Sequence, residues 1–358
     1  MWLIRLFSLL VLSISLATAQ TRGGVWRFAV SGDSRNCGDI VMPAIAQHVL
    51  ADNAQFYWHL GDFRAIYEID EDYAQTHQKT SSGAVPTMQD YLAGAWNDFI
   101  DNQLAYFGDT PVFLSLGNHE NIPPKNHNQV LVQFAAWLDA FPIRTQRLAD
   151  NSSDHTVKGY YHWRVSGIDF ITLDNSLDTF DAEQMTWLHN LLDSDVHDFS
   201  VRTLVVGMHE ALPDSISADH SMNQSPAGTA SGRTVSDWLV NFKVRAHKPV
   251  YVLASHSHFY MKGIFNTSAW LQRDATLPGW IVGTAGAIRY PLPPNAGAAL
   301  ECKTAVYGYM LGTVDVTKDE PIQFEFRQLS ESDVPADVVS RYSPAVVQDC
   351  WVNNIQQH

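Results

Sequence analysis

The sequence predicts an α/β protein, and three observations lead to this fold class. Short apolar runs recur along the chain, as expected for strands that are covered on both faces of a sheet. Segments with apolar residues at helical spacing separate these runs, and strands that alternate with helices form α/β sheets. Five of the runs end abruptly at a polar residue, and in such sheets ligands gather at the carboxyl ends of the strands.

The five apolar runs that end at polar residues predict the central strands. They cover residues 28–32, 56–61, 112–117, 204–208 and 250–255. Helices are predicted where apolar residues recur every three or four positions. They cover residues 42–51, 88–107, 129–140, 181–192 and 235–246. Residues 64–86 and 211–233 lack such a pattern and are predicted to be loops over the site, since loops this long are usually functional or disordered.

Further strands are predicted outside this central set. They cover residues 160–165, 170–173, 280–282, 307–316 and 322–326. Ser166 and Gly167 separate the first two and form a turn signal, so this pair is predicted to be a hairpin. The additional strands indicate a second sheet.

Residues 1–19 have the order of a secretory signal peptide. Arg5 precedes an apolar run at residues 6–16, and a small-x-small cleavage site ends at Ala19. The run is too short to span a bilayer, and a retained membrane anchor is the alternative interpretation. We therefore expect a secreted or periplasmic protein without stable membrane insertion. Because no linker or repeat divides residues 20–358, we expect them to form a single domain with a C-terminal strand extension.

The chain is acidic and rich in hydrophobic residues. Its formal net charge is −15 and 46% of its residues are hydrophobic, which is ample for a packed core. An acidic protein repels the phosphate backbone, so we expect no binding to nucleic acids. An anionic substrate would need a local positive charge, which bound metal ions provide. The sequence specifies no oligomeric state.

Three cysteines are present, Cys37, Cys302 and Cys350. An exported protein meets an oxidising compartment, where a disulfide is stable. Cys302 and Cys350 both lie in the C-terminal part, away from the polar strand ends, and are the favoured pair. Sequence alone cannot fix the connectivity, and three free thiols are the alternative.

Each of the five central strands stops at residue types that bind metal ions. The stops are Asp33, Asp62, Asn118 with His119, His209, and His256 with His258. Taken singly, a Gly-Asp pair is usually a turn or a helix cap, and a lone histidine usually belongs to the core. Together, carboxylates, an amide oxygen and imidazoles are ligands suited to Zn, Fe or Mn. Cysteine does not occur among the stops, which excludes a thiolate site.

The order and spacing of these motifs resemble the calcineurin-like metallophosphoesterases, and within them the purple acid phosphatase-like branch. The family pattern is GD…GD…GNH[DE]…H…GHxH, and this chain has GDSR, GDFR, GNHE, GMHE and SHSH. The resemblance runs from about Trp26 to Tyr260, with softer similarity through residues 279–286. It implies a four-layer α/β sandwich of two mixed β-sheets flanked by helices.

The resemblance also implies a role for each motif residue. The implied metal ligands are Asp33 and His258 for a first ion, Asp62 as a bridge to both ions, and Asn118, His209 and His256 for a second. The two ions would be Fe, Zn or Mn. In the implied mechanism a hydroxide that bridges the metals attacks phosphorus in line, and His119 contacts the phosphate and protonates the leaving group.

Three positions depart from the family pattern. Arg35 stands where many members carry a further histidine ligand, so the first metal would be under-coordinated, more labile or completed by water. The guanidinium of Arg35 is expected to bind a substrate phosphate oxygen, with a structural ion pair as the alternative. Ala65 replaces the tyrosine that gives purple acid phosphatases their colour, and Ser255 replaces a glycine.

The sequence therefore predicts a dinuclear-metal-dependent hydrolase of small phosphate esters, with phosphomonoesters favoured. Two alternatives remain at this point. One is a phosphodiesterase that acts on nucleotides or lipid head groups, because the motifs do not separate monoesters from diesters. The other is a non-catalytic binding module that descends from the enzyme.

Overall fold

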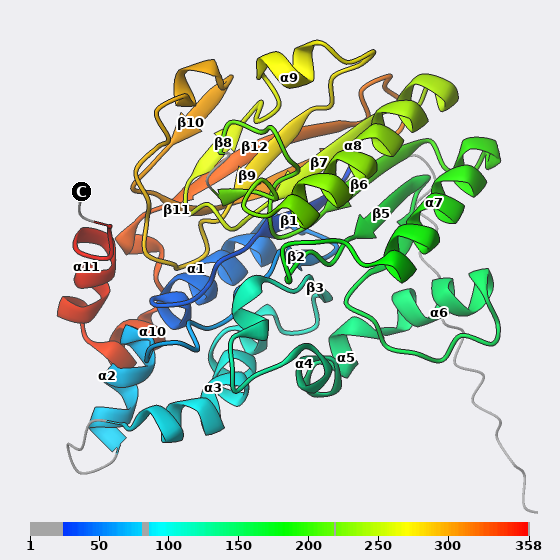
Figure 1. The fold of residues 1–358 in the computed structure, drawn as a ribbon. Coiled ribbons are helices and arrows are strands. Elements are labelled where there is room, and N and C mark those ends of the chain that lie inside the picture. The colour runs from blue at the N-terminus through cyan, green and yellow to red at the C-terminus, as the bar shows by residue number, and fades with distance from the viewer. Residues whose placement is uncertain (1–23, 81–85, 218–219, 357–358) are drawn as a thin grey trace, which may run out of the picture.

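The computed structural model describes residues 24–80, 86–217 and 220–356. The expected signal peptide lies outside the described residues. Within them the strands form two mixed sheets, which confirms the expected fold class (Figure 1). One sheet has the order β12-β11-β1-β2-β3, and the other has the order β10-β8-β9-β7-β6-β5-β4.

The first sheet joins the N-terminal strands to the end of the chain. Its strands are β1 (Trp26–Ser31), β2 (Tyr57–His59), β3 (Val112–Leu114), β11 (Tyr307–Val314) and β12 (Ile322–Leu329). The neighbours β1, β2 and β3 are parallel, whereas β11 pairs antiparallel with β1 and β12. The C-terminal strands thus extend the sheet that carries the first motifs.

The second sheet contains the hairpin predicted around Ser166. Its strands are β4 (Tyr161–Val165), β5 (Ile168–Thr172), β6 (Thr203–Gly207), β7 (Val250–Ala254), β8 (Tyr260–Lys262), β9 (Gly279–Val282) and β10 (Glu301–Lys303). β5, β6, β7 and β9 are parallel, while β4, β8 and β10 are antiparallel to their neighbours. The short strands β8 and β10 have no counterpart in the sequence-based prediction.

The two sheets pack face to face through aromatic side chains. The rings of Phe28 and Phe56 on one sheet lie 5.0 and 5.1 Å from Phe170 on the other. Next to Phe170, Ile171 points the other way and packs with a separate cluster that includes Leu188 and Leu239 of helices α7 (Ala182–His197) and α8 (Pro226–Ala246). Since successive strand residues face opposite sides, this alternation places the second sheet between the first sheet and these helices.

The remaining helices lie mainly against the first sheet and around its edge. On its far face, Tyr57 donates a hydrogen bond to Met42 of α1 (Gly38–Ala51), which completes the four layers. The other helices are α2 (Glu71–Thr80), α3 (Met88–Asn102), α4 (His127–Gln133), α5 (Ala135–Leu138), α6 (Phe141–Asp150), α9 (Ser268–Leu271), α10 (Ala336–Tyr342) and α11 (Pro344–Val352). None of the helices in the described part of the chain combines the length and apolar composition needed to cross a membrane.

Both segments expected to be long loops are partly helical. In residues 64–86, α2 is anchored by Arg64, which is fully buried and pairs with Asp72 of that helix as well as with Asp39 and Asp98. In residues 211–233, α8 begins early because Ser225 caps it by accepting a hydrogen bond from Gly228 N, with Pro226 in the first turn. The acidic residues of the first segment are therefore mostly structural.

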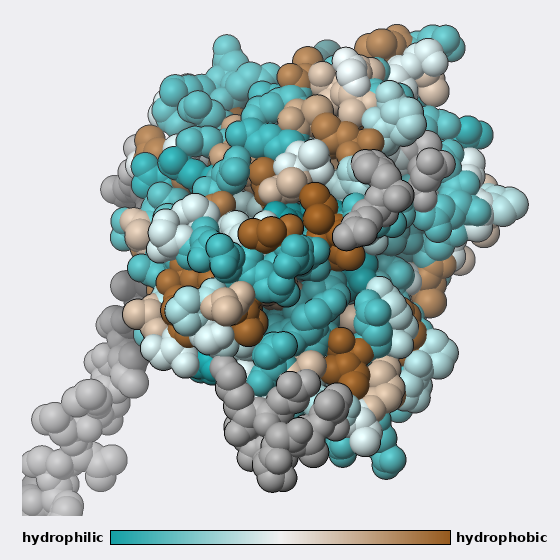
Figure 2. Space-filling view, turned by 90° about the vertical axis from the view of Figure 1, so that its left-hand side faces the viewer, coloured by the Kyte–Doolittle hydropathy of each residue, from teal (hydrophilic) through white to brown (hydrophobic). Residues whose placement is uncertain are grey.

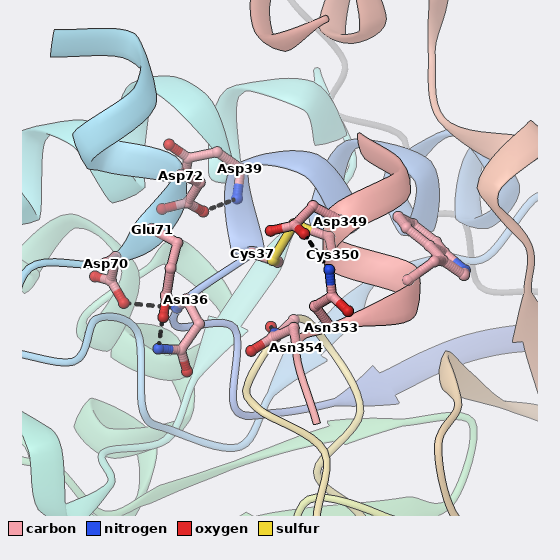
Figure 3. The surroundings of a disulfide bond; sticks show 12 residues. Asn36, Cys37, Asp39, Asp70, Glu71, Asp72, Asp349, Cys350, Asn353 and Asn354 are labelled. Atoms are coloured by element: carbon pink, nitrogen blue, oxygen red, sulfur yellow. Dashed lines mark hydrogen bonds between the residues drawn. A yellow bond between two sulfur atoms is a disulfide. The ribbon is translucent and has the colours of Figure 1, made fainter. Parts of the chain in front are cut away.

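The expected disulfide between Cys302 and Cys350 is wrong. Cys350 of α11 pairs with Cys37 at the start of α1, and their Cα atoms are 6.0 Å apart (Figure 3). Cys302 lies on β10 at the edge of the second sheet, whereas α11 packs beside α10 near the first. Closeness along the chain misled the prediction, because the chain passes from one sheet to the other between residues 302 and 350.

Candidate metal centre

The polar stops gather at one place because the parallel strands of both sheets end there. Asp33 and Asp62 follow β1 and β2 of the first sheet, and His209 and His256 follow β6 and β7 of the second. Asp33, Asp62 and His256 take the left-handed backbone conformation, with φ of 61°, 62° and 64°. The chain therefore turns sharply at each strand end and points these side chains at a common centre.

The gathered side chains form two groups that share one carboxylate. The ligand atoms of Asp62, His209 and His256 lie within 4.8 Å of one another, and so do those of Asp33, Asp62 and His258. Asn118 extends the group of Asp62, His209 and His256, because its Oδ1 lies 3.0 Å from His209 Nε2. The structure thus brings all six expected ligand residues together, with Asp62 between the two groups.

The polar atoms of the cluster fit metal ions. Asp33 Oδ1 and Asp62 Oδ2 are buried and have no hydrogen-bond partner among the described residues. The Nδ1 atoms of His209 and His258 lie 2.9 and 2.6 Å from the carbonyl oxygens of Leu60 and Ile288. Each Nδ1 thus donates to a carbonyl, which leaves the lone pair of Nε2 directed at the cluster.

The electrostatics of the cluster favour a positive charge. Burial lowers the pKa of His209, but the carboxylates of Asp62 and Asp33 outweigh it and raise this pKa to about 10. For Asp33, burial raises the pKa, but the attraction and hydrogen bond of His258 and the attraction of His209 together leave it below the usual value. The buried carboxylates favour a cation, and the imidazoles direct nitrogen lone pairs into the cluster. Together they form a set of oxygen and nitrogen ligands suited to transition metals.

His119 lies beside this cluster in a different arrangement. Its Nδ1 donates a hydrogen bond of 2.6 Å to Ala65 O, and its Nε2 lies 3.6 Å from Asp62 Oδ2. Its own backbone N donates to Asp62 Oδ1 at 3.1 Å. Burial lowers the pKa of the imidazole despite the opposing effect of Asp62. His119 therefore presents Nε2 to the site but belongs to neither ligand group.

A family model described as calcineurin-like phosphoesterase matches residues 27–260. The chain belongs to the calcineurin-like phosphoesterase family. This confirms the resemblance seen in the motifs, and with it the expectation of a phosphoesterase domain. A comparison with curated proteins found no match.

Two solved structures share the fold of this calcineurin-like phosphoesterase. A purple acid phosphatase from yellow lupin (Lupinus luteus) seeds has a TM-score of 0.53 and 15% sequence identity over 86% of this chain and 52% of the lupin chain. A structure of PhoD has a TM-score of 0.52 and 16% identity over 92% of this chain and 78% of that chain. This chain thus corresponds to about half of the lupin phosphatase chain, and at these identities the likeness concerns the fold.

Arg35, which replaces a histidine common in the calcineurin-like phosphoesterases, lies against the group of Asp33, Asp62 and His258. It is 4% exposed, and its Nη2 lies 3.2 Å from His258 Nε2. Its Nε is 3.8 Å from Asp62 Oδ2 and has no hydrogen-bond partner within the described ranges. The guanidinium thus adds a fixed positive charge at this end of the cluster.

Two tyrosines that sequence reasoning missed hold Arg35 in place. Tyr67 and Tyr290 accept hydrogen bonds from Arg35 Nη1 and Nη2 at 3.1 and 3.3 Å. The Tyr67 ring lies 5.3 Å from the His119 ring, so a tyrosine is present near the site even though Ala65 fills the family position. The pattern could have drawn attention to Tyr67, two residues after Ala65, but Tyr290 follows the last motif and carries no sequence signal.

Other residues orient the candidate ligands through hydrogen bonds. Ser255, which replaces the usual glycine, donates a hydrogen bond to Asp33 Oδ2, and His256 N donates to the same oxygen at 2.8 Å. Glu120 accepts hydrogen bonds from Asp62 N and Gly117 N at 2.9 and 2.6 Å. Such contacts orient metal ligands and contribute to metal affinity. Ser255 therefore contributes to the site by orienting Asp33, and is more than a tolerated replacement of glycine.

Proposed function

We propose that this calcineurin-like phosphoesterase hydrolyses small phosphate esters with two metal ions held in the cluster. The observation that carries the proposal is the sharing of Asp62 by the two ligand groups. A carboxylate with two oxygens can bridge two ions, and ions about 3.5–4 Å apart are typical of two-metal hydrolytic sites. When bound, such ions supply Lewis acidity at the phosphate oxygens and lower the pKa of a water that they hold.

Each ligand is assigned to one ion or to both. We assign Asp33 and His258 to the first ion, Asn118, His209 and His256 to the second, and Asp62 to both. Fe, Zn and Mn all suit these oxygen and nitrogen donors. The four residues of the second group follow β2 and β3 of the first sheet and β6 and β7 of the second, so the packing of the two sheets would bring the ligands of this ion together.

The other residues of the site act on the substrate. Arg35 binds a phosphate oxygen through the Nε–H that has no other partner. His119 directs Nε2 into the site, because its Nδ1 donates to Ala65 O. In the imidazolium form, Nε2–H gives its proton to the departing oxygen and the neutral imidazole remains. The extra positive charge of Arg35 beside the metal ligands favours the dianion of a phosphomonoester over a singly charged diester.

Export to an oxidising compartment is the proposed setting of this activity. The disulfide between Cys37 and Cys350 supports it, because disulfides persist in secreted and periplasmic proteins and are rare in the cytosol of most organisms. The signal-peptide pattern of residues 1–19 points to the same compartments.

A panel of phosphate monoesters and diesters tests this function. The protein is stripped of metal with a chelator and assayed with Mn²⁺, Zn²⁺, Fe²⁺ and Mg²⁺ in turn. Hydrolysis that disappears on chelation, returns with a transition metal and is faster for monoesters is the expected result. Faster hydrolysis of diesters would contradict the preference for monoesters and identify the protein as a phosphodiesterase. Metal binding without hydrolysis of any ester would instead identify a non-catalytic binding module.

A further inference from the structure

A cavity lies directly beside the metal centre. It has a volume of about 380 Å³ and opens between the loop that follows β9 and the segment near residue 217. Its lining is mostly apolar, and the described residues that form it are Ile216, Ser217, His220, Phe259, Tyr290, Pro291, Leu292, Pro293, Pro294, Asn295 and Gln356. Figure 2 views the side of the molecule that carries α11, where hydrophobic residues gather near the middle of the face.

Stacked rings connect this cavity to the metal ligands. Tyr290 stacks on His258 with ring centroids 4.0 Å apart, and on its other side it stacks on His220 at 5.2 Å. His220 in turn lies 5.5 Å from the ring of His256. Tyr290 and His220 are therefore shared by the cavity and by the surroundings of the ligands. A group attached to a phosphate at the metal centre would reach the cavity by passing over these rings.

The chemistry of the lining restricts what the cavity can accept. The described lining contains no Asp, Glu, Lys or Arg side chain. A charged or sugar-like group would lose its hydration there without gaining a charged partner, which is unfavourable. An apolar ring would instead contact Leu292, Phe259 and the prolines, and would pack beside the stacked rings of Tyr290 and His220. The polar residues Ser217, Asn295 and Gln356 provide a few points of orientation, as is usual in ligand pockets.

We infer that this cavity is the subsite for the ester group of the substrate, and that the substrates are phosphate esters of bulky apolar alcohols or phenols. The inference rests on the proposed phosphoesterase function and names its substrate class. Nucleotides and sugar phosphates, whose ester groups are charged or richly hydroxylated, are then poor substrates. Phosphate itself binds at the metal centre and does not use the cavity.

The test compares phenyl phosphate with 2-naphthyl phosphate. Their leaving groups have similar acidity, so the ratio of the two kcat/KM values reports contacts with the second ring and not the ease of departure. A well-filled apolar pocket discriminates by roughly 10-fold or more for such a difference in size. We expect the wild-type ratio to favour 2-naphthyl phosphate by about this factor, and 2-naphthol to inhibit competitively and more strongly than phenol.

Leu292→Asn provides the matching variant, because Leu292 is half-buried, lines the cavity and is not one of the proposed metal ligands. Leu300→Asn is its control, since Leu300 is 69% exposed and lies outside the cavity. Leu292→Asn should reduce kcat/KM for the naphthyl ester more than for phenyl phosphate, and so lower the ratio, while inhibition by inorganic phosphate stays unchanged because phosphate does not use the cavity. Leu300→Asn should keep the wild-type ratio.

The outcomes separate this inference from the proposed function. If wild type hydrolyses both esters with equal kcat/KM, or if Leu292→Asn and Leu300→Asn share one ratio, the subsite is wrong and the phosphoesterase function stands. If neither ester nor any other phosphoester is hydrolysed with any metal, the proposed function itself fails. Because the wild-type ratio and the naphthol inhibition need no variant, the inference is testable even if Leu292→Asn does not fold.

Discussion

The two halves of the metal cluster differ in the number of candidate ligands that the chain supplies and in whether a metal-binding nitrogen is already hydrogen-bonded to an arginine. The half formed by Asn118, His209 and His256 with Asp62 has four candidate ligands, and a hydrogen bond to Leu60 O orients His209. The half formed by Asp33 and His258 with Asp62 has three, and Arg35 lies 3.2 Å from the nitrogen that would bind metal.

In the proposed two-metal site, this difference follows from the presence of Arg35 at a position where many family members carry a histidine. Nδ1 of His258 donates to Ile288 O, so the lone pair on Nε2 accepts a hydrogen bond from Arg35 Nη2. A metal at Asp33 and His258 must displace that bond and also lie near a fixed positive charge. We therefore expect the ion of this half to bind more weakly than the ion of the other half, while phosphate gains a cationic partner.

Replacing the shared ligand breaks both halves at once and gives the largest expected effect. Asp62→Ala removes a ligand from each group, and metal ions contribute several kcal/mol to hydrolysis. We expect metal content to fall from two ions to fewer than one, and kcat/KM to fall at least about 10³-fold. The exposed Asp101 supplies the control variant Asp101→Ala, which should keep both ions. Two bound ions and full activity in Asp62→Ala would exclude Asp62 as the bridge.

His119 should affect proton transfer without affecting either half of the cluster. Positioned proton transfer contributes about 10²–10⁴-fold, and an alkoxide needs a proton on departure far more than p-nitrophenolate does. His119→Ala should therefore lose much more rate on alkyl phosphates than on p-nitrophenyl phosphate, with metal content unchanged. The exposed His197 offers the control His197→Ala. Equal losses on both substrates would leave His119 with a binding or structural role.

Arg35→Met should weaken the binding of phosphate but should not weaken the binding of the metal ion held by Asp33 and His258. Loss of the guanidinium removes a charge-assisted hydrogen bond to phosphate, worth about 1.5–3 kcal/mol, so inhibition by inorganic phosphate should weaken about 10-fold or more. The same change frees His258 Nε2, so the weaker metal should bind as well as in wild type or better. Arg144→Met, at a side chain that is 57% exposed, is the control. Unchanged phosphate inhibition would assign Arg35 to a structural ion pair.

Ser255→Gly restores the residue usual in the family and gives the smallest expected effect. It removes the hydroxyl that donates to Asp33 Oδ2, but His256 N still donates to the same oxygen. The loss in metal affinity should therefore be no more than about 10-fold, the lower end for contacts of this kind. The loss should appear only in the weaker of two metal-binding steps, measured by calorimetry. A loss of affinity in the tighter binding step would show that Ser255 also supports the ion of the other half, and that the two halves do not bind metal independently.

Much of the site was predictable because its ligands stand at strand ends in a fixed order. A buried strand that stops at Asp, Asn or His is visible in the sequence, and parallel strands bring their carboxyl ends together. The resemblance to the family paired Asp33 with His258, more than two hundred residues further along the chain, and the structure places their side chains 3.3 Å apart.

The parts that the sequence did not reveal depend on how distant segments fold onto this core. Cys350 meets Cys37 because α10 packs against α1 and α11 packs against α10, and no local pattern records these contacts. Tyr290 lies in a loop after the last motif, and only the path of the chain places it on His258. The helix α2 was missed because the pairing of Arg64 with buried carboxylates, which anchors that helix, is tertiary.

The most direct test of the two-metal account is a calorimetric titration of the metal-stripped protein with Mn²⁺ or Zn²⁺, with hydrolysis of p-nitrophenyl phosphate followed in parallel. The account predicts two ions per chain, bound in two steps of unequal affinity, with most of the activity arising in the second step. A single binding step that already gives full activity, or no binding at all, would contradict a cluster in which Asp62 bridges two metal ions.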